Sequence, residues 1–215
     1  MIMINAGIGE LKPVKQNLFS VLKDNTFFII SFFALLTGMF CGALSVRFLG
    51  ENFLLAIEQL LKNYITFRTS SGFLKVFSKI FLSCIIYMII IFISGFGVSG
   101  LPVIPLAVFV RGFGTCSLAG VLYRDYSLKG IAFADLILLP SCIAADFIII
   151  YAAGKSLSLS FKFCDLLKDL SSHGIAVRPQ CITLLKTALL CTAAICFSSI
   201  IEAVFSCCFI KYFSF

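Results

Sequence analysis

The sequence predicts an all-α fold: a polytopic integral membrane helical bundle with about five transmembrane helices and two interfacial amphipathic helices. The composition is 60% hydrophobic and 13% charged, whereas soluble domains are about half apolar and about a quarter charged. The apolar residues also fall in runs of roughly 20, the length of helix that crosses the hydrocarbon core of a bilayer. We therefore expect a multi-pass protein of the cell (cytoplasmic) membrane, in contact with the lipid bilayer.

The chain is expected to form one domain after a short leader. Residues 1–26 are a polar N-terminal leader, and residues 27–215 form a single transmembrane helical domain. An odd number of spans places the two termini on opposite sides of the membrane. The expected spans are 27–46, 77–98, 102–122, 131–153 and 181–205.

Basic residues in the connecting segments bear on orientation, because Lys and Arg are enriched on the cytoplasmic side. The leader and the loop at 155–180 favour a cytoplasmic N-terminus, whereas the loop at 47–79 favours the reverse. We take the N-terminus as cytoplasmic. The formal net charge of +7 is spread through the loops, which indicates contact with anionic headgroups. Because no basic cluster coincides with a soluble fold, we expect no nucleic-acid partner.

The first span carries two small residues at a helix-packing distance. Gly38 and Gly42 form a G-x-x-x-G pattern, which places both glycines on one face of the helix. The backbone of a second helix can approach such a face closely, so we expect it to be a packing face. The alternative is that the glycines only relieve crowding.

The two long connections each contain an amphipathic segment. In the 47–79 loop, Leu54, Ile57 and Leu61 belong to an apolar face that opposes charged and amide side chains. We expect this helix to lie at the membrane surface with its apolar face in lipid, or else to dock a partner protein. In the 155–180 loop, Phe and Leu residues oppose Lys and Asp in the same way, which predicts a second interfacial helix.

Charges at membrane depth mark the third and fourth spans. Arg111 lies in the third span, and Asp135 and Asp146 lie in the fourth. Such residues usually face a partner or a water-filled cavity. The polar link at 123–130 is short, so the two spans should pair as an antiparallel hairpin. Folding the link at its centre leaves Arg111 roughly 6 Å in height from Asp146 and roughly 10 Å from Asp135, which predicts an Arg111–Asp146 pair.

Glycine and proline residues complete this intramembrane polar and packing set. Gly112 and Gly114 follow Arg111 and allow another backbone to approach closely. Pro140 removes an N–H group from the fourth span and should kink it.

The sequence contains no recognisable catalytic or cofactor-binding set. His173 is the only histidine, so we expect neither a two-histidine metal site nor a Ser–His–Asp triad. Most of the ten cysteines lie in apolar spans without a C-x-x-C pair and behave there as small hydrophobic residues. We therefore expect no enzyme activity, no cofactor and no bound metal.

Several stretches of the hairpin region carry a family resemblance. FVRGFG at 109–114, a short polar link, LLP at 138–140 and SLSLS at 156–160 resemble the second half of the stage II sporulation protein M family. In that family an apolar helix holds Arg-Gly-Phe and the next helix holds Leu-Pro. The resemblance implies a membrane component of the sporulation engulfment complex. It would be a non-enzymatic scaffold that anchors cell-wall-degrading partners, which are peptidoglycan hydrolases, at the septal membrane.

Two other functions remain open. Arg111 with Asp135 or Asp146 would form a polar intramembrane site in a permease or transporter subunit. With five spans and no internal repeat, such a subunit would need a second copy, as a homo-oligomer, or an ATPase partner. The other reading is an envelope protein unrelated to sporulation that shares only the fold.

Overall fold

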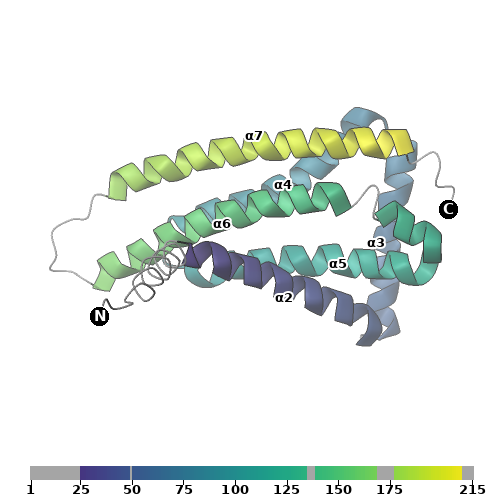
Figure 1. Cartoon of the computed structure of the whole chain (residues 1–215), viewed down its shortest axis with the longest axis horizontal. Helices are drawn as coiled ribbons and strands as arrows, with labels where there is room; N and C mark the ends of the chain where they lie inside the picture. The colour runs from purple at the N-terminus through teal and green to yellow at the C-terminus, as the bar shows by residue number, and fades with distance from the viewer. Residues whose placement is uncertain (1–24, 49, 135–138, 169–176, 210–215) are drawn as a thin grey trace, which may run out of the picture.

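A computed structural model describes residues 25–48, 50–134, 139–168 and 177–209. This part of the chain forms helices and no strand. The helices are α2 (Thr26–Phe48), α3 (Glu51–Ser70), α4 (Phe73–Gly95), α5 (Gly100–Phe133), α6 (Leu139–Lys168) and α7 (Val177–Phe209) (Figure 1). The all-α class expected from the sequence is confirmed.

Five of these helices are long and apolar enough to cross a membrane. The protein is therefore a multi-pass membrane protein whose outer face contacts lipid. The segments are Thr26–Phe48, Phe73–Gly95, Gly100–Asp125, Cys142–Cys164 and Cys181–Cys208. The first, second, third and fifth lie within a few residues of their expected places, and the fourth begins later than residue 131.

The spans lie side by side, and α3 crosses one end of the bundle (Figure 1). The core lies where the spans meet, and its most buried large side chains include Met88, Ile91, Ile104, Val108, Ile149 and Ile195. Because α2, α5 and α7 run towards the α3 end while α4 and α6 run away from it, the start of α2 and the end of α7 lie at opposite ends of the bundle.

The helix α2 packs more extensively against α5 than any other two helices of the described chain pack together. A Cβ atom at Gly38 would clash with the carbonyl of Phe109, and one at Gly42 would clash with the carbonyl of Phe113. From the opposite side, a Cβ at Gly112 would stand 2.6 Å from the carbonyl oxygen of Leu35. Only glycine permits such a backbone approach, so the G-x-x-x-G pattern of α2 is a packing face.

The position of α3 differs from the expectation that its apolar face lies in lipid. Leu54, Ile57 and Leu61 are buried in a small core with Val121 and Leu122 of α5. The amphipathic pattern correctly predicted a helix, but its apolar face is covered by α5 and not by lipid. A face buried in this way is also not free to dock a partner protein.

The polar link between the third and fourth spans is helical instead of forming a loop. α5 continues through 123–130 to Phe133, and the ribbon turns at the α3 end of the bundle (Figure 1). Val121, Leu122 and Ala134 pack on α3, and this contact stabilises the extra turns. The fourth span therefore begins near Cys142. Pro140 is the second residue of the described α6, and the four residues before Leu139 lie outside the described part, so the expected kink stays a prediction.

The second long connection also differs from expectation. α6 runs without a break to Lys168, so the apolar residues after position 155 extend a spanning helix and do not start a separate interfacial one. Ser156 and Ser160 are buried against the turn between α4 and α5, and Ser160 Oγ donates to the carbonyl oxygen of Gly97 at 2.7 Å. The small serine side chains allow this close contact, since Ser156 lies directly against Gly95.

Candidate functional site

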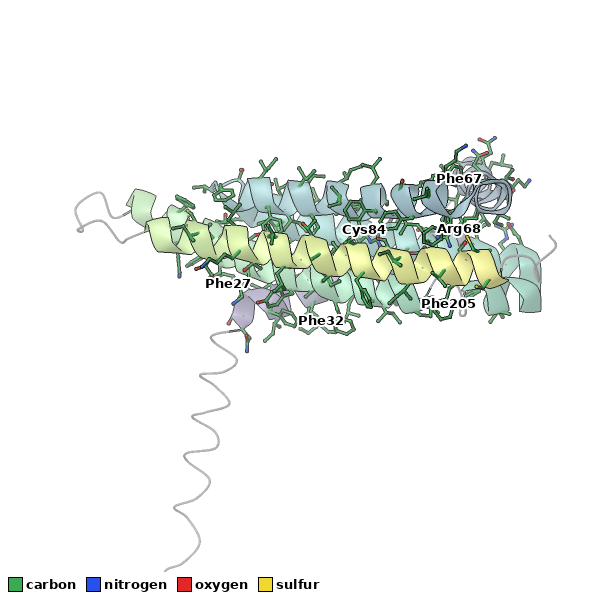
Figure 2. The ribbon with its side chains drawn as sticks, turned by 90° about the horizontal axis from the view of Figure 1, so that it is seen from above. Phe27, Phe32, Phe67, Arg68, Cys84 and Phe205 are labelled. Atoms are coloured by element: carbon green, nitrogen blue, oxygen red, sulfur yellow. The ribbon has the colours of Figure 1, made fainter. Side chains whose placement is uncertain are left out.

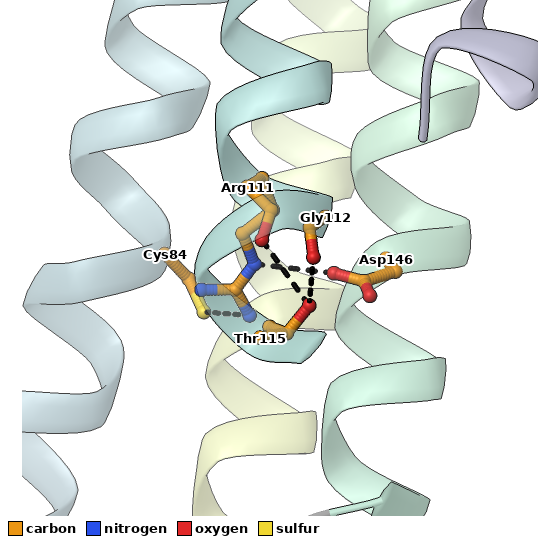
Figure 3. Close-up of polar contacts among 5 residues, drawn as sticks. All are labelled: Cys84, Arg111, Gly112, Thr115 and Asp146. Carbon is orange, nitrogen blue, oxygen red and sulfur yellow. Dashed lines mark hydrogen bonds and ion pairs between the residues drawn. The ribbon is translucent and has the colours of Figure 1, made fainter. Parts of the chain in front are cut away.

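A buried ion pair joins α5 to α6 near the middle of the bundle. Arg111 Nε donates to Asp146 Oδ1 at 3.1 Å, and both side chains are largely buried (Figure 3). Arg111 Nη2 lies 3.9 Å from the Cys84 sulfur of α4, and the Arg111 guanidinium stands 5.5 Å from the centroid of the Tyr87 ring. Arg111 therefore links three helices, and a guanidinium that cannot lose its proton has its charge balanced inside the protein.

The local structure of α5 fixes this arginine. Thr115 Oγ1 donates to the carbonyl oxygens of Arg111 and Gly112, at 3.2 Å and 2.9 Å (Figure 3). The next residue, Gly112, lies against the α2 backbone. The same turn of helix thus places its glycine towards α2 and its arginine towards α4 and α6.

A second buried ion pair joins α3 to α7. Arg68 Nη2 donates to Glu202 Oε1, and the Arg68 side chain is only 2% exposed. The guanidinium also stacks on Tyr64 of its own helix, 4.3 Å from the ring centroid. Burial raises the pKa of the Tyr64 phenol well above its usual value, and the charge of Arg68 only partly offsets this, so Tyr64 is neutral.

Both ion pairs border one cavity of about 280 Å³. Its wall comes from α3, α4, α5, α6 and α7, and its polar and aromatic side chains include Tyr64, Arg68, Lys79, Tyr87, Arg111 and Glu202. Figure 2 places Arg68 and Phe67 at the α3 end and Cys84 nearer the middle, so the cavity extends inward from that end. Its position fits the expectation that an ionisable residue inside a membrane faces a partner or a cavity.

The cavity opens on the flank of the bundle between α4 and α5. The exposed residues of its wall include Lys79 and Ser83 on α4 and Gly114 on α5. All three lie within the membrane-spanning segments. At the end of the bundle, α3 places Tyr64, Phe67 and Arg68 over the cavity. The mouth therefore faces the bilayer side of the protein.

The structure brings together some of the residues expected at this site and separates others. Arg111 and Asp146 are paired, and Gly112 makes the close backbone contact that was expected. Gly114 does not: a Cβ there would meet nothing within 4 Å, because the residue borders the open mouth. Asp135 lies outside the described residues.

Sequence reasoning did not find the Arg68–Glu202 pair. A signal was present in the spacing. Leu54, Ile57, Leu61 and Ile65 are the buried stripe of α3, and Arg68 continues that stripe at the next helical interval. A cation on the apolar face of an amphipathic helix indicates a buried partner.

The rest of the described chain offers little other chemistry. Each of the ten cysteines lies in this part and is a free thiol. Within the described residues, no group of three or more His, Cys, Asp or Glu side chains could hold a metal ion. Comparisons with family models, with curated proteins and with solved structures found no match for this chain.

Proposed function

We propose that this chain is a non-enzymatic membrane scaffold of the stage II sporulation protein M type, which anchors cell-wall-degrading proteins at the septal membrane during engulfment. The observation that carries the proposal is the position of the FVRGFG run at 109–114. Residues of the run that bears the family resemblance contact α2, α3 and α6.

Four residues of that run, Phe109, Arg111, Gly112 and Phe113, contribute contacts between helices. The backbone of Phe109 and Phe113 lies against Gly38 and Gly42 of α2. Arg111 pairs with Asp146 of α6. The Phe113 ring also lies 6.3 Å from the ring of Phe53 on α3. A motif that is used in this way to hold a bundle together suits a scaffold, since a scaffold needs a rigid membrane body and no reacting group.

The polar face of α3 offers a surface for the partners. While its apolar stripe is buried on α5, Gln59, Lys62 and Asn63 are exposed at the end of the bundle. We assign the hydrolase contact to this face. The Arg68–Glu202 pair holds α3 at the end of the spanning helix α7, so a partner bound to α3 would be kept close to the membrane surface.

The proposal is tested by purifying the tagged full-length chain from its native host under conditions that induce sporulation. We expect a peptidoglycan hydrolase to co-purify, identified by mass spectrometry and by zymography on cell-wall material. Lys62→Glu should lower the amount recovered, and Lys155→Glu, an exposed change on α6 beside the start of α2, should not. A folded, membrane-inserted chain that recovers no hydrolase in such cells would contradict the scaffold function.

The cavity favours a second candidate, a permease or transporter subunit. Arg111 borders a hollow near the middle of the membrane, where a substrate site would be expected. Uptake of solutes into vesicles that contain only this protein distinguishes the two. A scaffold gives no uptake, whereas a transporter loses uptake when Arg111 and Asp146 are both replaced by Leu even though the double variant folds.

A further inference from the structure

The charges around the cavity do not balance. Arg68 is paired with Glu202, and Arg111 is paired with Asp146. Lys79 makes no ion pair with a carboxylate among the described residues, and its ammonium instead stands 4.1 Å from the centroid of the Phe67 ring. The wall of the cavity therefore carries one positive charge more than its acidic neighbours neutralise, close to the α3 end.

One donor at the same end also lacks an acceptor. Arg68 Nη1 is buried and has no hydrogen-bond partner, although Nη2 of the same guanidinium is bound to Glu202. A buried donor on a charged group is costly to leave unpaired, so such groups almost always have a partner. Arg68 and Lys79 both border the cavity, so we expect an anionic hydrogen-bond acceptor to lie there.

The approach to the cavity indicates where this acceptor comes from. α3 covers the end of the cavity, whereas the mouth at Ser83 and Gly114 opens between two membrane-spanning segments. A molecule dissolved in the bilayer meets this mouth directly. A solute in water would have to pass the buried side chains of α3.

The shape of the cavity suits a molecule with a head and a tail. Its wall on α4 runs from Val76 to Tyr87, which is roughly 16 Å along a helix axis. The cations Arg68 and Lys79 lie at the end nearer the membrane surface.

We propose that this cavity binds an anionic membrane lipid, whose phosphate-bearing headgroup contacts Arg68 and Lys79 and whose acyl chain leaves between α4 and α5. The headgroup supplies the acceptor that Arg68 Nη1 lacks and balances the charge of Lys79. The lipid joins α3, α4 and α5 at the end of the bundle where α3 crosses it.

The test uses the full-length protein in nanodiscs of phosphatidylcholine with a small fraction of phosphatidylglycerol that carries a photoreactive diazirine in its acyl chain. The yield and the site of cross-linking are measured by mass spectrometry. We expect cross-links on α4 and α5 near Ser83 and Gly114. Lys79→Gln should lower the yield about tenfold, since a hydrogen bond to a charged group is lost, and Lys79→Arg should keep it.

Two variants separate this site from general attraction to headgroups. Gly114→Leu places a side chain in the open mouth without a backbone clash and should lower the yield as much as Lys79→Gln does. Val110→Leu, one turn earlier on the exposed side of α5, and Lys75→Gln, one turn earlier on α4, should leave it unchanged. Each variant is first shown to keep the wild-type melting temperature.

Two results would overturn the proposal. Equal losses for Lys75→Gln and Lys79→Gln, with none for Gly114→Leu, would mean that the lysines only attract headgroups to the surface. Full competition by millimolar inorganic phosphate or glycerol phosphate would mean that the cavity takes a soluble anion and not a lipid.

Discussion

Arg68 of α3 and Glu202 of α7 form a buried ion pair, although 134 residues separate them in the chain. The pair fastens the helix that crosses the end of the bundle to the last span. α3 and α7 pack on each other less than most neighbouring helices of the described chain do, so we expect this pair to contribute strongly to how α3 is held.

Breaking this pair should destabilise the protein. Arg68→Leu leaves Glu202 as an uncompensated buried charge, at a cost of about 3–5 kcal/mol, and Glu202→Leu should cost a similar amount. The measurement is the melting temperature of the purified protein in detergent. Arg47→Leu, at an exposed arginine near the same end, serves as the control. An unchanged melting temperature in both Arg68 and Glu202 variants would contradict the pairing.

The Arg111–Asp146 pair predicts a recovery in a double variant. Arg111→Leu and Asp146→Leu should each lower the amount of folded protein by leaving one buried charge, again at about 3–5 kcal/mol. The double variant removes both charges and should regain much of the loss. Protein level and melting temperature are measured for the singles and the double. Strictly additive losses would show that the two residues do not depend on each other.

The α2–α5 contact predicts strong sensitivity at particular glycines. Gly38→Leu should prevent the close approach to Phe109 and destabilise the bundle by more than the roughly 1–3 kcal/mol usual for overpacking, because the obstacle is backbone. Gly50→Ala is the control, since a Cβ there meets nothing within 4 Å. Folded protein is quantified by size-exclusion chromatography. Wild-type behaviour of Gly38→Leu would contradict the packing face.

Neighbouring leucines of α3 should respond in opposite ways. Leu61 is 1% exposed and Leu60 is 65% exposed. Leu61→Glu buries a charge in the core shared with α5 and should abolish folding or α3 docking, whereas Leu60→Glu should have little effect. Limited proteolysis across 51–70 reports whether α3 stays docked. Equal resistance of the two variants would favour an α3 held by lipid instead of by α5.

If α4 spans the membrane, its two ends should be accessible from opposite faces of the membrane. Gly72 and Val98 are exposed and lie just before and just after this span. In a background without native cysteines, Gly72→Cys and Val98→Cys should react with a membrane-impermeant maleimide from opposite faces of the membrane. Labelling of both from one face would exclude a spanning α4.

Features that depend on local composition were predictable from the sequence. The five spans follow from apolar runs of sufficient length, because the bilayer sets the length of helix that it can hold. The packing face of α2 was predictable because Gly38 and Gly42 have no side chains and lie on one side of the helix. Arg111 and Asp146 were placed near each other because few charges at membrane depth lie within reach of one another.

The tertiary structure decided how these helices end and what they touch. The link at 123–130 is polar, yet α5 continues through it, because Val121, Leu122 and Ala134 on either side of the link pack on α3. The fourth span therefore starts later than expected. Likewise, an amphipathic pattern specifies that the face with Leu61 must be covered but does not say whether lipid or protein covers it. The Arg68–Glu202 pair and the cavity arise only when α3, α4, α5, α6 and α7 meet, because no local rule relates residues so far apart in the chain.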